Sequence, residues 1–279
     1  MGFRVPRPVR AFLLGTLALF STAVSAQYDT VVAAPFVTTP ADVVDRMLKL
    51  AGTGPADYVV DLGSGDGRIV IAAAKNFGAR GLGLELDPKL VAQSKANARA
   101  AGVADRAEFR VEDVLRADFS QATVVTVYLL PGLMAQLSPM FLDGLRPGAR
   151  IVTHAFVFPS WRPDRVEKMR VAEPHPSQGD ESTIFLWVVP AKARGAWRAA
   201  SAQGEWRLRV DQNFQEIEVE GERNGAKLDV KQANLSGREV SFSGSVANAP
   251  FSFRGRIDGN RMTGQAQLAQ GAQPLEFTK

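Results

Sequence analysis

Three closely spaced glycines follow the first strongly apolar segment after the N-terminal region. The sequence VVDLGSGDGR at residues 59–68 places Gly63, Gly65 and Gly67 between an apolar run and an alanine-rich stretch with helical periodicity. Glycine permits a tight turn and lets a ligand approach the bare backbone. The helix that follows presents unpaired N–H groups to anionic ligand groups. The segment therefore predicts a strand, a ligand-binding loop and a helix within an α/β fold.

The alternation of apolar strands and helices continues to residue 190. Apolar runs predict strands over residues 56–63, 81–87, 107–113, 122–130, 150–156 and 183–190. Helical spacing predicts helices over 40–51, 68–77, 88–101 and 133–145, the first with Thr39 as its N-cap and Pro40 at its first position. The region between 156 and 183 is polar and proline-rich. Strands separated by helices predict a doubly wound, mainly parallel sheet.

Residues 194–279 change character, because helical spacing disappears and apolar residues alternate with polar ones. Turn signals such as Asn224-Gly225 and Asp258-Gly259 recur at intervals typical of antiparallel strands. The pattern predicts a small all-β domain that forms a meander or a barrel. We therefore predict an α/β domain at 27–193 and a β-rich domain at 194–279, joined by a linker near Ala191–Ala196.

The first 26 residues have the three parts of a secretory signal peptide. A cationic start is followed by an uncharged apolar run, and Val24-Ser25-Ala26 supplies small residues before the expected cleavage site. The run is shorter than the roughly 20 apolar residues that span a membrane. We predict cleavage after Ala26 and export to the periplasm or the medium, with an uncleaved membrane anchor as the alternative.

Composition narrows the chemistry further. The chain has no cysteine and two histidines, His154 and His175, which argues against a disulfide, a thiolate metal site or a histidine metal site. His175 lies in a predicted surface loop and receives no role. The net charge is +4, but three of the arginines lie in the predicted signal segment. The remaining chain is close to neutral, so the charge gives no strong indication of nucleic-acid binding.

The glycine segment departs from the GxGxxG pattern of dinucleotide-binding loops, because position 68 is arginine and an acid precedes the first glycine. It resembles instead the first motif of class I S-adenosylmethionine-dependent methyltransferases, an acid followed by GxGxG. This resemblance implies that 27–193 is a methyltransferase domain with a seven-strand sheet, and that S-adenosylmethionine is the cofactor. The absence of cysteine and the two lone histidines predict no metal site. The resemblance implies that the following residues surround the methionine moiety of the cofactor: Asp61, Gly63, Ser64, Gly65, Asp66 and Gly67.

Two further segments at strand ends match the same family. GLELDP places Glu85 at the end of the second strand, where the family uses an acid to bind both ribose hydroxyls. RVEDVL places Asp113 where the family has an acid that accepts from the adenine amino group. Val114 would then supply a neighbouring backbone or apolar contact. The resemblance extends over about residues 35–190.

A narrower resemblance concerns the acceptor. DLGSGDGRIVIAAAK at residues 61–75 and PFVTTP at residues 35–40 look like the lysine methyltransferases that act on the c-subunit of the mitochondrial ATP synthase. Those enzymes are distantly related to Dot1-type histone methyltransferases, and this chain looks most like their bacterial relatives. The resemblance implies a protein lysine as the methyl acceptor. It also implies that the segment Phe36–Thr39 folds over the cofactor.

The catalytic groups are less well marked. In class I enzymes the end of the fourth strand faces the transferred methyl group, and this chain has VYLLPG there instead of an (Asn/Asp)-Pro-Pro-(Tyr/Phe) motif. That difference argues against methylation of DNA adenine or glutamine. Tyr128 and His154 are weak candidates for catalysis, since a buried tyrosine or a lone histidine more often makes a structural hydrogen bond. Trp161 and Trp187 are expected in the core rather than in a substrate groove.

Three functions are consistent with these residues. The leading hypothesis is an S-adenosylmethionine-dependent methyltransferase with a protein lysine as acceptor. A small-molecule methyltransferase, with the β-domain as a lid or specificity module, is the first alternative. The second is a non-catalytic protein that binds the cofactor. Export favours the non-catalytic reading, because S-adenosylmethionine is made in the cytoplasm, whereas intact Asp61, Glu85 and Asp113 favour a working site.

Overall fold

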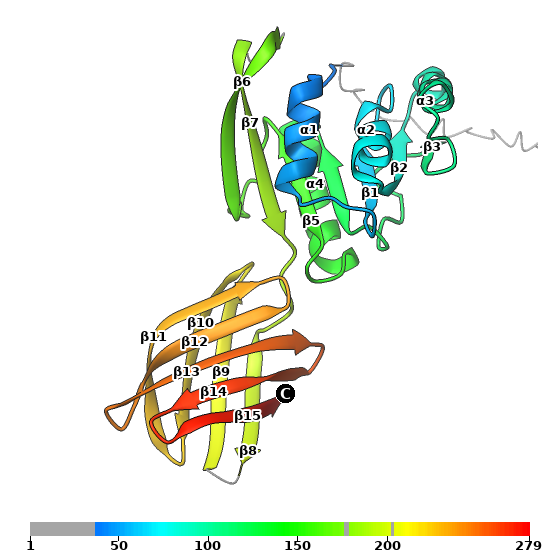
Figure 1. Cartoon of the computed structure of the whole chain (residues 1–279). Coiled ribbons are helices and arrows are strands. Elements are labelled where there is room, and N and C mark those ends of the chain that lie inside the picture. The colour runs from blue at the N-terminus through cyan, green and yellow to red at the C-terminus, as the bar shows by residue number, and fades with distance from the viewer. Residues whose placement is uncertain (1–36, 176–178, 202–203) are drawn as a thin grey trace, which may run out of the picture. The chain divides into compact units, whose positions relative to one another are not determined.

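The computed structural model describes residues 37–175, 179–201 and 204–279. These residues form two β-sheets that share no strand (Figure 1). The predicted signal segment at 1–26 lies outside the described residues, as does Phe36. Within the described ranges, no helix combines the length and the apolar character that crossing a membrane requires.

The first sheet has seven strands in the order β3-β2-β1-β4-β5-β7-β6. The first five of that order run parallel, and β7 runs antiparallel to both β5 and β6. The strands are β1 Tyr58–Leu62, β2 Arg80–Glu85, β3 Ala107–Val111, β4 Val124–Val127, β5 Arg150–His154, β6 Arg165–His175 and β7 Gly179–Val188. The helices are α1 Ala41–Leu50, α2 Arg68–Phe77, α3 Pro88–Ala100 and α4 Pro131–Gly144. The predicted doubly wound, mainly parallel sheet is confirmed.

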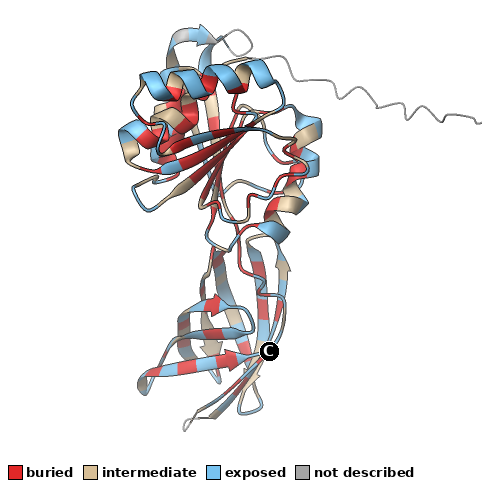
Figure 2. Ribbon diagram, turned by 90° about the vertical axis from the view of Figure 1, so that its right-hand side faces the viewer, coloured by how far each residue is buried: buried red, intermediate tan, exposed pale blue. Residues whose placement is uncertain are grey.

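Helices cover both faces of this sheet. Helices α1 and α2 pack Met47 and Ile69 against Val59 on one face, and α3 lies on the same face beside α2. Helix α4 packs Leu137 into the cluster that contains Val60 on the opposite face. Val59 and Val60 are neighbours in β1, and alternate residues of a strand point to opposite faces. The central strands β1, β4 and β5 are therefore buried on both sides, as the red ribbons of Figure 2 show.

Two local predictions were wrong. Thr39 does not cap α1, because its hydroxyl lies 3.2 Å from Nδ1 of His154, and the helix begins at Ala41. The polar stretch before β7 contains a strand, β6, whose backbone ends at His175 instead of passing through a loop. Among the described strands, β6 lies at the edge of the sheet and pairs only with β7, and its Val166 is exposed. An exposed edge strand needs little apolar alternation, which explains why the sequence pattern missed it.

The second sheet is a closed antiparallel barrel, which settles the choice between meander and barrel. Its strands are β8 Gly195–Ser201, β9 Gly204–Asn213, β10 Glu216–Arg223, β11 Ala226–Ser236, β12 Glu239–Val246, β13 Ala249–Asp258, β14 Arg261–Leu268 and β15 Gly271–Thr278. Asn224 and Gly225 both have positive φ, at 52° and 79°. Two such residues form the tight turn that suits a hairpin, as their sequence predicted.

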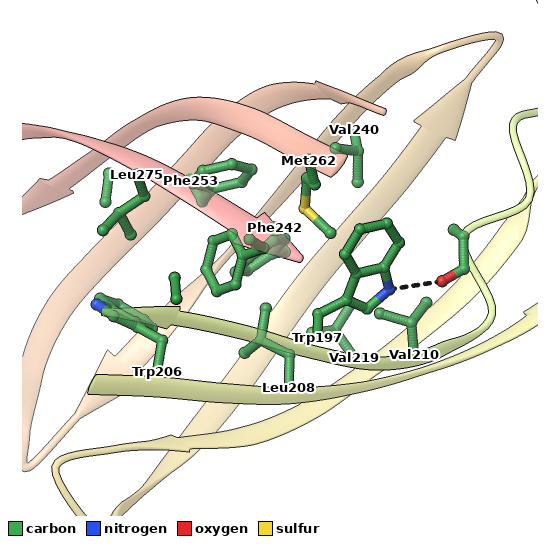
Figure 3. Packing of buried hydrophobic residues seen from close by; sticks show 14 of the residues in the cluster. Trp197, Trp206, Leu208, Val210, Val219, Val240, Phe242, Phe253, Met262 and Leu275 are labelled. Atoms are coloured by element: carbon green, nitrogen blue, oxygen red, sulfur yellow. Dashed lines mark hydrogen bonds between the residues drawn. The ribbon is translucent and has the colours of Figure 1, made fainter. Parts of the chain in front are cut away.

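Apolar side chains fill the interior of the barrel. Trp197, Trp206, Phe242 and Phe253 belong to one buried cluster between the strands (Figure 3). The rings of Phe242 and Phe253 stack with their centroids 5.0 Å apart. The indole N–H of Trp197 donates to the carbonyl of Ala193 at 2.7 Å, so this buried polar group is satisfied.

Candidate active site

The residues that the sequence singled out lie at the carboxyl ends of the parallel strands. The glycine loop follows β1, Glu85 is the last residue of β2, and Asp113 comes two residues after β3. Tyr128 follows β4 directly, and His154 is the last residue of β5. Open α/β sheets bind ligands outside these strand ends. One edge of the sheet therefore gathers the whole candidate site.

The glycine loop has a backbone that only glycine adopts easily. Gly63, Gly65 and Gly67 have φ values of 77°, 52° and 84°. A Cβ on Gly67 would lie 2.7 Å from the ring of Phe109, so this glycine also allows the loop to pack closely against β3. The Ser64 hydroxyl is buried and has no hydrogen-bond partner among the described residues. The loop therefore presents backbone toward a ligand.

Ser64 faces the sheet beneath the loop. Its Oγ would lie 2.6 Å from a Cβ on Gly83 of β2, so the glycine at position 83 makes room for it. Consequently, Ser64 can meet a cofactor through its backbone more readily than through its hydroxyl.

Asp61 is a buried acid at the end of β1. It is 3% exposed, and its Oδ1 accepts a hydrogen bond from Oγ1 of Thr126 at 2.7 Å. Burial raises the pKa of Asp61 to about 7 against the lowering effect of this hydrogen bond, and the charges of Glu85 and Asp66 raise it further. No cation pairs with Asp61 in the part of the chain that the structure describes. A buried carboxylate without a cation is costly, so this position fits a ligand that brings positive charge.

Glu85 already binds three backbone N–H groups. Its Oε2 accepts from Gly65 at 3.0 Å, and its Oε1 accepts from Leu86 at 2.8 Å and from Asp87 at 3.1 Å. A carboxylate has about four lone-pair positions, which leaves about one for another donor. Glu85 thus fixes the glycine loop to the end of β2. To bind both hydroxyls of a ribose, Glu85 would have to give up at least one of its hydrogen bonds to backbone N–H groups.

Arg68 joins the glycine loop to the segment before α1. Its guanidinium donates to both carboxylate oxygens of Asp66, from Nε at 3.0 Å and from Nη2 at 2.7 Å. Its Nη1 donates to the carbonyl of Thr39 at 2.9 Å. Planar two-point contacts of this kind fix orientation as well as distance. The chain just before α1 is therefore tied to the loop that the resemblance assigns to the methionine moiety.

Asp113 and Val114 follow β3. Oδ1 of Asp113 accepts from the backbone N–H of Leu115 at 3.0 Å, and its side chain is 35% exposed. Val114 is buried within the cluster that also contains α4. The backbone N–H of Glu112 donates to the carbonyl of Glu85, which places the ends of β2 and β3 side by side. Asp113 is thus the more accessible of the two predicted contacts.

Tyr128 and His154 lie next to each other, with their ring centroids 4.4 Å apart. His154 is fully buried, and its two ring nitrogens lie 3.2 Å from the hydroxyls of Thr39 and Ser182. Tyr128 is only partly buried. This geometry favours a positioning role for His154 and leaves Tyr128 as the more accessible of the two candidates.

Several partners of these residues were missed from the sequence. Thr126 is paired in register with Asp61, and the parallel pairing of β1 with β4 was the signal that could have identified it. Thr39 and Ser182 carried no such signal, because they meet His154 only through the tertiary fold. Trp161 and Trp187 are at most 1% exposed, so their prediction as core residues is confirmed. Within the described ranges, no three acidic, cysteine or histidine side chains are placed to hold a metal ion.

Comparison with known proteins explains this arrangement. The ANTKMT methyltransferase domain family matches residues 61–165. A protein-lysine N-methyltransferase of Saccharolobus islandicus is 37% identical over 156 residues, which cover 56% of this chain and 93% of that protein. The chain belongs to the S-adenosylmethionine-dependent methyltransferases. The predicted family and cofactor are thereby confirmed.

Other relatives extend the match to eukaryotic enzymes and to a solved structure. The ATP synthase c-subunit lysine N-methyltransferase of Mus musculus is 40% identical over 132 residues, covering 47% of this chain and 52% of that enzyme. This chain thus spans about half the length of that relative. The crystal structure of an RNA methyltransferase from Salinibacter ruber in complex with S-adenosyl-L-homocysteine is 47% identical, with a TM-score of 0.51. The match covers 56% of this chain and 95% of that structure.

The residues at the strand ends fit S-adenosylmethionine. The glycine loop leaves its backbone bare, and the buried Asp61 has no protein cation to neutralise it within the described residues. S-adenosylmethionine carries positive charge on its sulfonium and its ammonium group. The loop residues, Glu85 and Asp113 would therefore hold this methyltransferase's cofactor along the edge of the sheet.

Proposed function

We propose that this methyltransferase transfers the methyl group of S-adenosylmethionine to the side-chain nitrogen of a protein lysine. The observation that carries the proposal is the match to the protein-lysine N-methyltransferase of Saccharolobus islandicus, which extends over 93% of that protein. The relatives named as lysine methyltransferases of the ATP synthase c-subunit and of the adenine nucleotide translocase support the same acceptor.

The reaction places few demands on protein side chains. When bound, S-adenosylmethionine supplies a methyl group on a positively charged sulfur, which is already a good leaving group. The protein aligns the acceptor nitrogen with this methyl group and excludes water. A lysine ammonium has a pKa near 10.4 in water, so its proton must leave before the nitrogen can attack. We assign the contact with the acceptor to Tyr128, with the buried His154 holding its ring.

An RNA acceptor is the second candidate, favoured by the similarity to the RNA methyltransferase of Salinibacter ruber. RNA binding depends on clustered basic residues that neutralise phosphates. The chain without residues 1–26 has thirty basic and twenty-nine acidic residues, which supports the protein acceptor instead. A small-molecule acceptor and a purely binding function are the remaining alternatives.

The acceptor can be identified with labelled S-adenosylmethionine. The purified protein is incubated with the labelled cofactor and an extract of cells that lack the protein, and the label is followed in protein, RNA and small-molecule fractions. We expect label on lysine residues of protein, located by mass spectrometry. The Gly65→Val variant, which should not bind the cofactor, serves as the control and should give none.

Each other outcome contradicts the proposal in its own way. Label in RNA would support the second candidate, and label only in small molecules would support a metabolite acceptor. Binding of S-adenosylmethionine without transfer to any fraction would favour a non-catalytic protein.

We also propose that the protein acts outside the cytoplasm after cleavage behind Ala26. The cationic start, the apolar run and the small residues before position 27 support this location. An exported methyltransferase needs cofactor from the cytoplasm, so the location and the activity have to be tested separately.

A further inference from the structure

A ligand of the barrel has to bind on its outer surface, because side chains fill the interior. Trp197, Trp206 and Phe253 are each at most 1% exposed, and Figure 3 shows them packed together between the strands. Interiors packed in this way contain few voids larger than a water molecule. The outer surface is therefore where a further site can be sought.

The outer surface has two regions of different chemistry. On β9 and β10 the outward residues are charged and pair with each other, as Arg207 does with Glu222. The middle of the outer face of β11, β12 and β13 instead carries hydroxyls and carboxamides together with Arg254, and charged residues such as Lys231 and Arg256 lie around it. Charged alternation keeps a strand soluble without any ligand. The uncharged polar region needs a different explanation.

A hollow of about 410 Å³ lies in this uncharged region. Its polar lining consists of Gln232, Asn234, Ser241, Ser243, Ser252 and Arg254. They form two rows across the strands, since β12 pairs with both of its neighbours in register. One row consists of Gln232, Ser243 and Ser252, and the other consists of Asn234, Ser241 and Arg254. Small serines form the floor, and longer side chains rise at its margins.

None of these six side chains makes a hydrogen bond or an ion pair within the described part of the chain. Arg254 differs in this from Arg256, which lies two residues further along β13 and has Glu239 4.0 Å away. Three hydroxyls, two carboxamides and one guanidinium are thus free to donate, and five of them can also accept. The lining contains no carboxylate to repel an anion.

The chemistry of the lining excludes two common classes of ligand. A nucleic acid would call for several cations and for exposed aromatic rings on which bases stack, and the hollow offers one cation while its two phenylalanines face the core. An extended peptide binds at a free strand edge or in apolar pockets, and β12 and β13 are paired along both edges. A ligand with several hydroxyls and one acidic group fits this lining, because its hydroxyls can bond to the serine hydroxyls and the carboxamides and its acidic group can pair with Arg254.

We propose that this hollow binds an acidic carbohydrate, a sugar chain that carries carboxylates. The hydroxyls of the sugar bond to the serine, asparagine and glutamine side chains, and one carboxylate pairs with Arg254. The volume suits a ligand of a few sugar units, since small-molecule sites range from roughly 300 to 1,000 Å³. This site is independent of methyl transfer and gives the barrel a binding function of its own.

The test is calorimetric titration of the purified protein with trigalacturonate and trimannuronate. We expect at least one of them to bind, and Arg254→Gln to weaken that binding tenfold or more. Ser243→Val should abolish this binding, because the two methyl groups of valine fill the floor of the hollow. Valine is well suited to strands, so the melting temperature should be unchanged or higher. Arg256→Gln is the matched control on the same strand and should bind as the wild type does.

Three results would overturn the proposal. The first is no binding of either uronate at millimolar concentration. The second is an equal loss in Arg254→Gln and Arg256→Gln, which would indicate general surface charge. The third is displacement of the uronate by an equal concentration of inorganic phosphate, which would reduce the hollow to an anion site. A neutral galactose trisaccharide should bind at least tenfold more weakly than the uronate.

Discussion

Asp61 makes cofactor binding depend on pH. Burial raises the pKa of this carboxyl to about 7, and no protein cation opposes the effect within the described residues. At pH 6, about nine tenths of the free protein therefore carries a neutral Asp61. S-adenosylmethionine brings positive charge to the loop next to this carboxyl, and a nearby opposite charge favours the ionised form. We expect binding to expel the proton of Asp61.

The size of the effect follows from the pKa of Asp61, which is about 7. Binding should release about 0.9 proton per cofactor at pH 6 and about 0.1 at pH 8, provided that the pKa falls well below 6 in the complex. The apparent affinity should be about tenfold weaker at pH 6 than at pH 9, because only the ionised fraction is ready to bind.

Calorimetry at pH 6 in two buffers of different ionisation enthalpy counts the released protons. Asp61→Asn keeps the size and polarity of the side chain and should bring the release close to zero. Asp113→Asn is the control, because its side chain is 35% exposed and lies after another strand. The reasoning would be refuted by a wild-type protein that releases no proton at pH 6, or by an equal release from Asp61→Asn.

The same carboxyl affects stability without ligand. An acid whose pKa rises on folding binds its proton more tightly in the folded state than in the unfolded state. The free protein should therefore lose stability as the pH rises from the ordinary value of 3.8 to about 7. Thermal unfolding of Asp61→Asn should lack this part of the pH dependence.

Three further variants or products are informative. Glu85→Ala should weaken S-adenosylmethionine binding at least tenfold, because it removes both the predicted acceptor for the ribose and the hydrogen bond to Gly65. Each hydrogen bond to a charged group contributes about 1.5–3 kcal/mol, and an unchanged affinity in calorimetry would rule out this role. His154→Gln should lower the melting temperature but leave the shape of the pH–rate profile as in the wild type, and a changed shape would make His154 the base. N-terminal sequencing of the mature protein should begin at Gln27, whereas an intact Met1 in the cytoplasm would contradict export.

The sequence was sufficient to locate the glycine loop between β1 and α2, because the relevant signals are local. The glycines with positive φ lie within a few residues of both the preceding strand and the following helix. Helix α2 begins and ends at the residues that the sequence predicted. The acid at the end of β2 was found in the same way. Such features depend on neighbouring residues in the chain, so spacing alone reveals them.

Contacts between distant segments could not be predicted in this way. Thr39 has the residue type and place of an N-cap, but its hydroxyl contacts a histidine 115 residues away in sequence. The closure of the barrel depends on the pairing of β8 and β15, which lie at opposite ends of the domain's sequence, and alternation within each strand does not indicate which strands pair. The pairing of Tyr128 with His154 likewise needs the adjacency of β4 and β5 and the orientation of both rings.

Calorimetric titration of the purified protein with S-adenosylmethionine and S-adenosylhomocysteine tests the central claim most directly. The account predicts that each binds at one site per chain. It also predicts that Gly65→Val, which adds a branched side chain at a φ of 52°, remains folded by circular dichroism and binds neither. Absence of binding by the wild-type protein, or equal affinity in Gly65→Val, would contradict a cofactor site at the glycine loop.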